Sequence, residues 1–201
     1  MREGTPGRIL GAGLVLFARR GYDGTSIRDI GAQLGLKPAN LYAHYKSKEH
    51  LLAELVRIGH EEHQRGLRRA LVDSAPGPVA QIESLVRAHV RFHADYALLA
   101  TVANNEMHVL GGELAAPSLA LRQQSEAMFS DVVERGIAHG LFHPPHPWVT
   151  VAAIAGMGMR VAHWYRPELG ILPAAIADAH AELAVRMLGV APSRRRTSRS
   201  T

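Results

Sequence analysis

The chain has 201 residues, 47% of them hydrophobic, which is enough for a small domain followed by a larger one with its own core. It contains no cysteine, which excludes disulfide bonds and thiolate metal sites. It also has no run of about 18 apolar residues and no charged-then-apolar leader, so we expect a soluble, cytoplasmic protein that does not bind membranes.

The net charge of +5 is unevenly distributed along the chain. Residues 1–50 carry 8 basic and 4 acidic groups, whereas residues 51–189 carry 11 basic and 14 acidic groups. The last 12 residues carry 4 arginines and no acid. A basic N-terminal part on an acidic body is typical of a part that meets a polyanion, because phosphate neutralisation supplies most nonspecific affinity. A solvated fluctuation in charge would explain the same pattern.

The first expected helix covers residues 5–20 and stops at Gly21. The chain from 25 to 48 then reads as two short helices joined by a tight turn. Together these three helices would pack into a small head around a shared apolar core. The predicted core residues are Phe17, Ile30, Leu41 and Tyr45.

Local signals set the ends of the two short helices. Ser26 can cap the first helix, with Asp29 in a capping-box position. Gly35 supplies the permissive backbone that the chain needs to leave that helix. Pro38 opens the second helix, where a missing N–H is harmless. A short basic helix held at a fixed angle by the helix before it is typical of a probe of the DNA major groove.

The remainder of the chain predicts only further helices, so the fold class is all-α. A long helix over 48–72 joins the head to the body. The body helices are expected at 79–96, 97–110, 117–140, 147–165 and 173–188. We therefore divide the chain into a helix-turn-helix DNA-binding domain (1–50), a helical ligand-binding and dimerisation domain (51–190), and a basic tail (191–201) that we expect to be disordered.

Two stretches of the N-terminal region resemble the TetR family of bacterial transcriptional regulators. They are ILGAGLVLFARRGYDGTSIRDI, from Ile9, and LYAHYKSKEHLL, from Leu41. The resemblance covers about the first 55 residues, and the body matches only in length and helix arrangement. It implies a homodimer of about nine helices per subunit, with a head that binds double-stranded operator DNA and a body that senses a small ligand.

The resemblance also implies which head residues contact DNA. The phosphate contacts would be Thr25, Tyr42 and Lys48, and the base-edge candidates are Arg28, Lys37, Ala39 and Asn40. His44 lies on the same outer side, although it could equally shield the small core. The chain departs from the family at Lys37-Pro38-Ala39-Asn40, where Ser-Lys-Gly-Thr is common. The operator sequence therefore cannot be transferred from relatives.

The body carries aromatic, methionine and polar side chains on its expected inner helices, which favours an apolar pocket for a small hydrophobic effector. The candidates are His89, Phe92, His93, Tyr96, Asn104, Met107, Met128, Phe129, Met157, Arg160 and Trp164. For any single methionine or phenylalanine, ordinary core packing is the simpler explanation. The polar members of the set are harder to explain as core.

The segments VRAHVRFH and GMRVAHWYRP are similar to TetR-type regulators of lipid and acyl-CoA catabolism. This similarity suggests a fatty or steroid-derived acyl-CoA as the effector, with Arg87, Arg91 or Arg160 available for its phosphates. A lipophilic drug or an aromatic metabolite remains an alternative ligand. The last two helices would form the dimer interface, through small residues such as Ala152 and Gly156 and an apolar face.

Two alternatives belong to other classes of protein. The 12 histidines suggest, as the first alternative, a metal-responsive or metal-dependent protein. Its ligands would include His89 and His93, which are four residues apart on one helix face. A tetrahedral site needs three or four ligands, and no carboxylate stands at signature spacing near the pair. A nonspecific DNA-compacting protein would need no pocket. No nucleophile or phosphate-loop motif is present, so we predict no enzyme activity and no cofactor.

Overall fold

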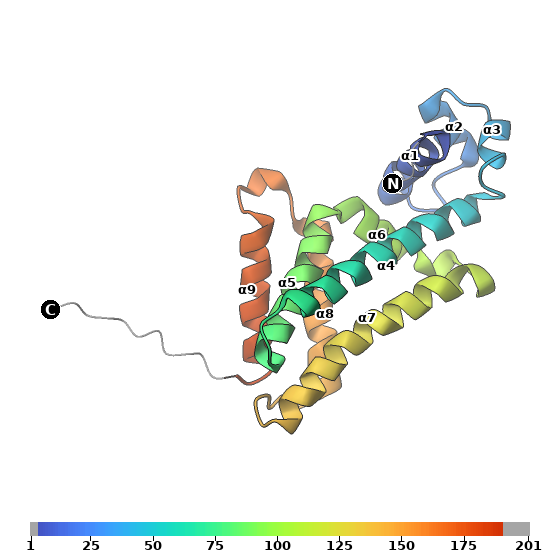
Figure 1. Ribbon diagram of the computed structural model, residues 1–201. Helices are drawn as coiled ribbons and strands as arrows, with labels where there is room; N and C mark the ends of the chain where they lie inside the picture. The colour runs from blue at the N-terminus through green and yellow to red at the C-terminus, as the bar shows by residue number, and fades with distance from the viewer. Residues whose placement is uncertain (1–3, 191–201) are drawn as a thin grey trace.

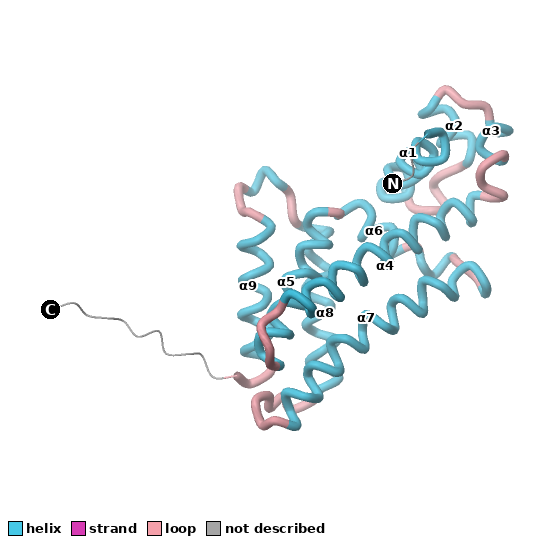
Figure 2. The backbone as a smooth tube through the Cα atoms, in the orientation of Figure 1, coloured by secondary structure: helices cyan, strands magenta, loops and turns pink. Residues whose placement is uncertain are grey.

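The computed structural model describes residues 4–190, and within that range the chain folds into nine α-helices and two short 3₁₀ helices without a strand (Figures 1 and 2). The expected all-α class is therefore confirmed. The basic tail predicted for residues 191–201 lies outside the described residues. None of the described helices is both long enough and apolar enough to cross a bilayer.

Three helices form the head at one end of the molecule (Figure 1). They are α1 (Gly4–Arg20), α2 (Ile27–Leu34) and α3 (Pro38–Tyr42). The four side chains predicted for the head core are all buried: Phe17, Ile30, Leu41 and Tyr45. Burial of these apolar side chains fixes the angle between α2 and α3.

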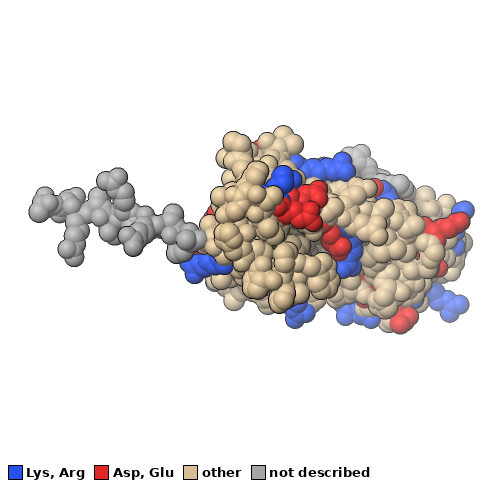
Figure 3. Space-filling model, turned by 90° about the horizontal axis from the view of Figure 1, so that it is seen from below, with Lys and Arg blue, Asp and Glu red and all other residues tan. Residues whose placement is uncertain are grey.

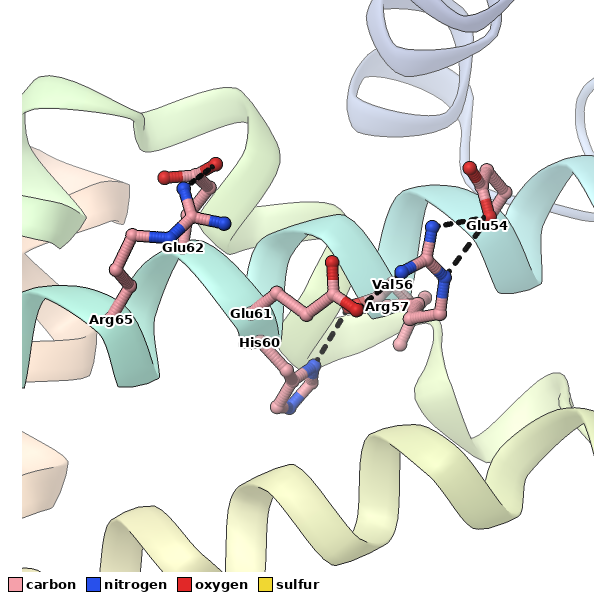
Figure 4. Close-up of polar contacts among 7 residues, drawn as sticks. All are labelled: Glu54, Val56, Arg57, His60, Glu61, Glu62 and Arg65. Carbon is pink, nitrogen blue, oxygen red and sulfur yellow. Dashed lines mark hydrogen bonds and ion pairs between the residues drawn. The ribbon is translucent and has the colours of Figure 1, made fainter.

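The head is joined to the body by α4 (Lys48–Asp73), which starts in the head and crosses the body (Figure 1). It packs on α5 (Pro78–Asp95), α6 (Ala97–Asn105) and α7 (Gly112–Ala138). Along its outer side, the Arg57 guanidinium pairs with the carboxylates of Glu54 and Glu61 (Figure 4). A rigid helix of this length can carry a displacement in the body to the head.

The C-terminal part of the body consists of α8 (Pro147–Trp164), the 3₁₀ helix η2 (Pro167–Leu169) and α9 (Pro173–Met187). Helix α9 packs mainly on α5, on the side of the body away from the head (Figure 1). Several large apolar side chains of this region are exposed: Trp148, Val149, Trp164, Leu169, Ile171, Leu172 and Leu183. On the face shown in Figure 3, acidic and basic groups are scattered between wide areas that carry neither.

Two expected boundaries differ from the structure. Helix α7 begins at Gly112 rather than at 117, so Pro117 lies inside it. A proline is usually the sign of a first helical turn, but here it is accommodated one turn further in. The expected helix over 97–110 is divided into α6 and the 3₁₀ helix η1 (Met107–Val109), a tightening that is common at helix ends.

The core of the head continues into the body. Its apolar cluster includes Leu51 and Leu55 of α4 together with Val102, Met107 and Leu110 from the segment of α6 and η1. Two backbone amides at this junction donate to carboxylates. The N–H of Tyr22 reaches Glu106 Oε2 at 3.2 Å, and the N–H of Gly111 reaches Glu49 Oε1 at 3.5 Å. The position of α6 is thereby tied to the start of the two-helix unit.

Candidate functional site

The start of α2 is fixed by hydrogen bonds between neighbours in sequence. Asp29 N donates to Ser26 Oγ at 3.1 Å, and Ser26 N donates to Asp29 Oδ2 at 2.8 Å, which confirms the predicted capping box. The helix ends at Gly35, whose φ of 67° lies in the left-handed region that favours glycine. The turn between α2 and α3 is therefore specified locally.

Helix α3 presents a polar outer side. Pro38 occupies its first turn, and the residue before it, Lys37, makes no side-chain capping bond, as expected from the missing hydroxyl. Tyr42 is 54% exposed. The remaining candidates for base or phosphate contact on this side are also exposed, namely Arg28, Lys37, Ala39, Asn40 and His44. These six exposed side chains lie on α2, α3 and the residues next to α3.

Thr25 and Lys48 are placed differently from the other DNA-contact candidates. Thr25 is only 1% exposed, and its hydroxyl donates to the Gly21 carbonyl at 2.9 Å, so this hydroxyl is not presented to a partner. Lys48 Nζ donates to the carbonyls of Tyr22 at 2.8 Å and Thr25 at 2.9 Å. It also lies 3.7 Å from the centre of the Tyr22 ring. Both residues hold the turn between α1 and α2 in place.

A cavity of about 240 Å³ lies in the body where five helices meet. Helices α4, α5, α6, α7 and α8 each contribute wall residues. The lining residues are Gly59, His60, His63, His89, Phe92, His93, Ala103, Asn104, Arg122, Ser125, Glu126, Phe129, Ser130, Trp148, Val151, Ala152, Ala155 and Met159. Most of the surface of this wall is apolar, and four histidines are among its polar lining residues.

Three of the histidines form a hydrogen-bonded chain that spans the helices. His89 Nε2 donates to the Ala155 carbonyl of α8 at 2.9 Å. His63 Nε2 of α4 lies 2.8 Å from His89 Nδ1 of α5. His93 Nδ1 donates to the His89 carbonyl at 2.8 Å, and Asn104 of α6 donates to His93 Nε2 at 3.2 Å. The chain thus connects four of the five cavity helices.

Burial keeps these rings neutral. It lowers the pKa of His63, His89 and His93 to about 3 each, chiefly by desolvation and further by the neighbouring imidazoles. Desolvation also lowers the pKa of His60, against a hydrogen bond to the Val56 carbonyl that raises it. At neutral pH each ring therefore carries a single N–H.

The structure brings five of the predicted ligand-site residues into this cavity. They are His89, Phe92, His93, Asn104 and Phe129. Met107 instead belongs to the core between head and body, and Met128 packs against the body core. Tyr96 follows the end of α5 and lines a separate groove.

Met157, Arg160 and Trp164 do not line the cavity either, for a reason of helix geometry. The α8 residues that do line it, including Val151, Ala155 and Met159, recur at the helical period. At about 100° per residue, the three predicted residues point to the opposite side of α8. The prediction of these three residues was therefore correct in its helix and wrong in its face.

The predicted set also lacks wall residues on α4, α6, α7 and α8. His60 and His63 are three residues apart, a spacing that indicates a shared helix face but not what that face contacts. The close contact of α8 with His89 depends on Gly158, where an added Cβ would lie 2.1 Å from His89 Cδ2. Only the glycine lets the ring reach the Ala155 carbonyl.

The metal alternative gains no support from the geometry. Both ring nitrogens of His89 are engaged, one with Ala155 and one with His63, and His93 is bonded at both nitrogens as well. Among residues 4–190, no group of three or more metal-ligating side chains has an arrangement that could hold an ion.

Arginines suggested for ligand phosphates are also placed away from the cavity. Arg87 pairs with Asp178 and Glu83, and Arg91 pairs with Asp95. The arginine that does line the cavity is Arg122, which is exposed and paired with Glu126 at 3.0 Å.

The helical head with its exposed α3 and the body cavity agree with the comparisons to known proteins. Residues 9–55 match the model of bacterial regulatory proteins of the tetR family, and residues 75–188 match the model of the tetracyclin repressor-like C-terminal domain. The chain belongs to the TetR family. It is therefore a helix-turn-helix transcriptional regulator and not an enzyme.

Individual TetR-family relatives extend this match over most of the chain. The transcriptional repressor KstR2 of Mycobacterium tuberculosis is 27% identical over 174 residues, which cover 80% of this chain and 81% of the relative. A TetR-family regulatory protein from Rhodococcus RHA1 is 32% identical, with a TM-score of 0.86, and covers 94% of this chain and 100% of its own. The structure of AibR in complex with isovaleryl coenzyme A and operator DNA has a TM-score of 0.79 at 23% identity, covering 89% of this chain and 96% of its own.

Proposed function

We propose that this TetR-family regulator acts in the cytoplasm as a homodimeric repressor, released from its operator when a small hydrophobic effector fills the body cavity. The observation that carries the proposal is the course of α4 and α6. Both helices line the cavity, and both also contact the head. A ligand that moves either wall therefore displaces the two-helix unit. Coupling free energies of this kind are typically about 1–3 kcal/mol.

The path from the cavity to the head is short along α6. Asn104 at the cavity donates to His93, and Glu106, two residues later, accepts the N–H of Tyr22 in the head. The Lys48 ammonium in turn donates to the backbone carbonyls of both Tyr22 and Thr25. A shift of α6 on ligand binding would reach the turn before α2 through these bonds.

In the head, we assign base reading to Arg28, Lys37, Ala39 and Asn40, which are all exposed. Tyr42 and His44 would contact the DNA backbone. For Thr25 and Lys48, the geometry supports an indirect role, in which they hold the turn whose backbone meets the phosphates. In a dimer, the two α3 helices would enter major grooves about 34–36 Å apart or somewhat more.

The dimer interface is assigned to the exposed apolar surface of α8 and α9. Leu183 and Trp164 are exposed there, whereas Ala152 lines the cavity, and Ile176 and Leu188 turn into the body core. Changing Leu183 to Glu should place a charge in an isologous contact and shift the protein to monomers. Light scattering across a concentration series would measure the molar mass of the variant. A variant that remains a dimer would show that the interface lies on another surface.

For the effector, an acyl-CoA is our first choice of ligand class. AibR, a structural neighbour, is complexed with isovaleryl coenzyme A. The apolar wall of the cavity suits an acyl chain, and the exposed Arg122 is among the lining residues that could meet an anionic group. A lipophilic drug or an aromatic metabolite is the competing class.

The DNA part of the proposal is tested by fluorescence anisotropy with two duplexes of equal length, one from the promoter of the protein's own gene and one of random sequence. We expect tighter binding to the promoter by about a hundredfold or more. Equal affinity would support a nonspecific DNA-compacting protein instead. If the protein instead stimulated transcription from that promoter in a purified system, it would be an activator and not a repressor.

The ligand part is tested by adding isovaleryl-CoA and longer acyl-CoA thioesters to the protein–promoter complex. We expect at least one of them to weaken promoter binding several-fold to a hundredfold. Free coenzyme A is the matched control, because it carries the phosphates without an acyl chain. If the whole series behaves like free coenzyme A, the acyl-CoA class is wrong.

A further inference from the structure

Two histidines of α4 leave one ring nitrogen each without a hydrogen-bond partner in the described part of the chain. His60 Nδ1 lies 2.9 Å from the Val56 carbonyl, and His63 Nε2 lies 2.8 Å from His89 Nδ1. The remaining positions are His60 Nε2 and His63 Nδ1. Neither is fully buried, and both rings line the cavity. In Figure 4, the His60 ring projects from α4 toward α7.

The direction of the hydrogen bonds fixes where the protons lie. A carbonyl oxygen can only accept, so His89 must donate from Nε2 to Ala155, and its Nδ1 must accept. His63 must then donate from Nε2, which leaves its Nδ1 unprotonated, with a free lone pair. By the same rule, His60 donates from Nδ1 to Val56, which leaves its Nε2 bare. Both free positions are thus hydrogen-bond acceptors.

The surroundings keep this arrangement in place. Burial lowers the pKa of His63 to about 3 and also lowers that of His60, so neither ring takes up a second proton near neutral pH. The ring of Phe92 lies 5.1 Å from that of His63, and Phe129 lies 5.8 Å from His89. An apolar ligand in the cavity would therefore leave two lone pairs unsatisfied unless it brought a donor.

We propose that the cavity selects an apolar ligand that carries a hydroxyl group, whose single hydrogen is accepted by His60 Nε2 or by His63 Nδ1. This deepens the proposed function, in which the preferred acyl-CoA would then be one whose acyl chain bears a hydroxyl, and rests on the cavity being the effector site. A ketone of the same skeleton presents a lone pair to these nitrogens and is rejected. A site that hydrogen-bonds a hydroxyl discriminates strongly against analogues that lack it, because its own buried groups are then left unpaired.

The test uses 1-indanol and 1-indanone, two-ring molecules with the same skeleton that differ in donor capacity. Binding to the full chain, without DNA, is measured by calorimetry and by the fluorescence of Trp148, which lines the cavity. We expect the alcohol to bind at least about fivefold more tightly than the ketone. Equal affinity, or no binding of the alcohol up to its solubility limit, overturns the proposal.

Variants identify the acceptors. His60→Phe keeps a ring and removes the free nitrogen, and it should reduce the preference for the alcohol. His63→Gln can still donate to His89 and offers an oxygen as acceptor, so it should keep the preference, whereas His63→Leu should reduce it. His108→Phe is the matched control, since this exposed ring also bonds a backbone carbonyl but lies outside the cavity. An unchanged preference in both His60→Phe and His63→Leu overturns the assignment.

Nitrogen NMR of the imidazole rings gives a readout that needs no ligand. His60 Nε2 and His63 Nδ1 should have the shifts of unprotonated nitrogens at pH 7.5 and should move on addition of 1-indanol. A protonated nitrogen at both positions contradicts the proposal. Because these measurements contain no DNA, a hydroxyl preference without any effect on promoter binding would reject the effector role while leaving this selectivity intact.

Discussion

The helix ends of the head and the body cavity differ in the sequence distance over which their contacts form. At the start of α2, Ser26 and Asp29 cap the helix across three residues. In the cavity, His63 meets His89 across 26 residues, and His89 meets Ala155 across 66. Removing a helix cap weakens only the end of that helix, whereas removing a contact shared by several helices weakens the packing of every helix that it joins. Substitutions in the cavity should therefore have larger effects on stability than those in the head.

The largest expected effect is the loss of stability at acidic pH, where the cavity histidines can be protonated only in the unfolded chain. In the unfolded chain their pKa is near 6.5, whereas in the folded cavity it is about 3. The stability from this difference is complete above pH 6.5 and is lost as the pH falls toward 3. Between pH 8 and pH 5 each ring should remove about 2 kcal/mol from the free energy of unfolding.

Urea denaturation at a series of pH values measures this effect. The variant His63→Gln keeps a donor for His89 but cannot titrate, so its stability should depend less steeply on pH by about one proton. A wild-type stability that is flat from pH 8 to pH 5 would show that the rings are not held neutral.

The second effect concerns the contact between α5 and α8. The change Gly158→Ala places a methyl group against the His89 ring and should reduce the free energy of unfolding by about 3 kcal/mol, through overpacking and loss of the bond to Ala155. Gly156→Ala on the same helix is the matched control, because its added Cβ meets nothing within 4 Å. Thermal and urea unfolding of both variants compare them directly. Similar stabilities would mean that the close contact with His89 is unimportant.

A third and smaller effect is expected at the turn between α1 and α2. Lys48→Met keeps the stem of the side chain but removes the donors to Tyr22 and Thr25, which should lower stability by about 1–2 kcal/mol. Its affinity for DNA should fall at all salt concentrations, because the turn is no longer held. Lys46→Met, which removes an exposed charge nearby, should act only through the salt dependence of binding. Identical salt slopes and stabilities for the two variants would assign Lys48 a direct phosphate contact.

The smallest effect should come from the cap of α2. Ser26→Ala removes the acceptor for Asp29 N and should lower stability by about 1 kcal/mol. The ligand affinity of the body should not change, and calorimetry with the same probe can establish this. A loss of ligand binding in this variant would mean that the head and the cavity are less distinct than their contacts indicate.

The same contrast explains what the sequence could predict. Ser26, Gly35 and Pro38 mark helix ends through their own backbone chemistry, so the helix ends of the head were predicted correctly, including the absent cap at Lys37. The cavity could be predicted only in part, because its wall depends on which faces of five helices converge. Met157 and Met159 differ by two positions, and only Met159 lines it.

The junction between head and body has a consequence for building chimeric regulators. The head core includes Val102, Met107 and Leu110, and Tyr22 donates to Glu106. A head transplanted at residue 50 would therefore meet a foreign surface where α6 and η1 had been. A functional exchange of operator specificity should carry the 102–110 segment with the head, or else confine itself to the exposed side chains of α2 and α3.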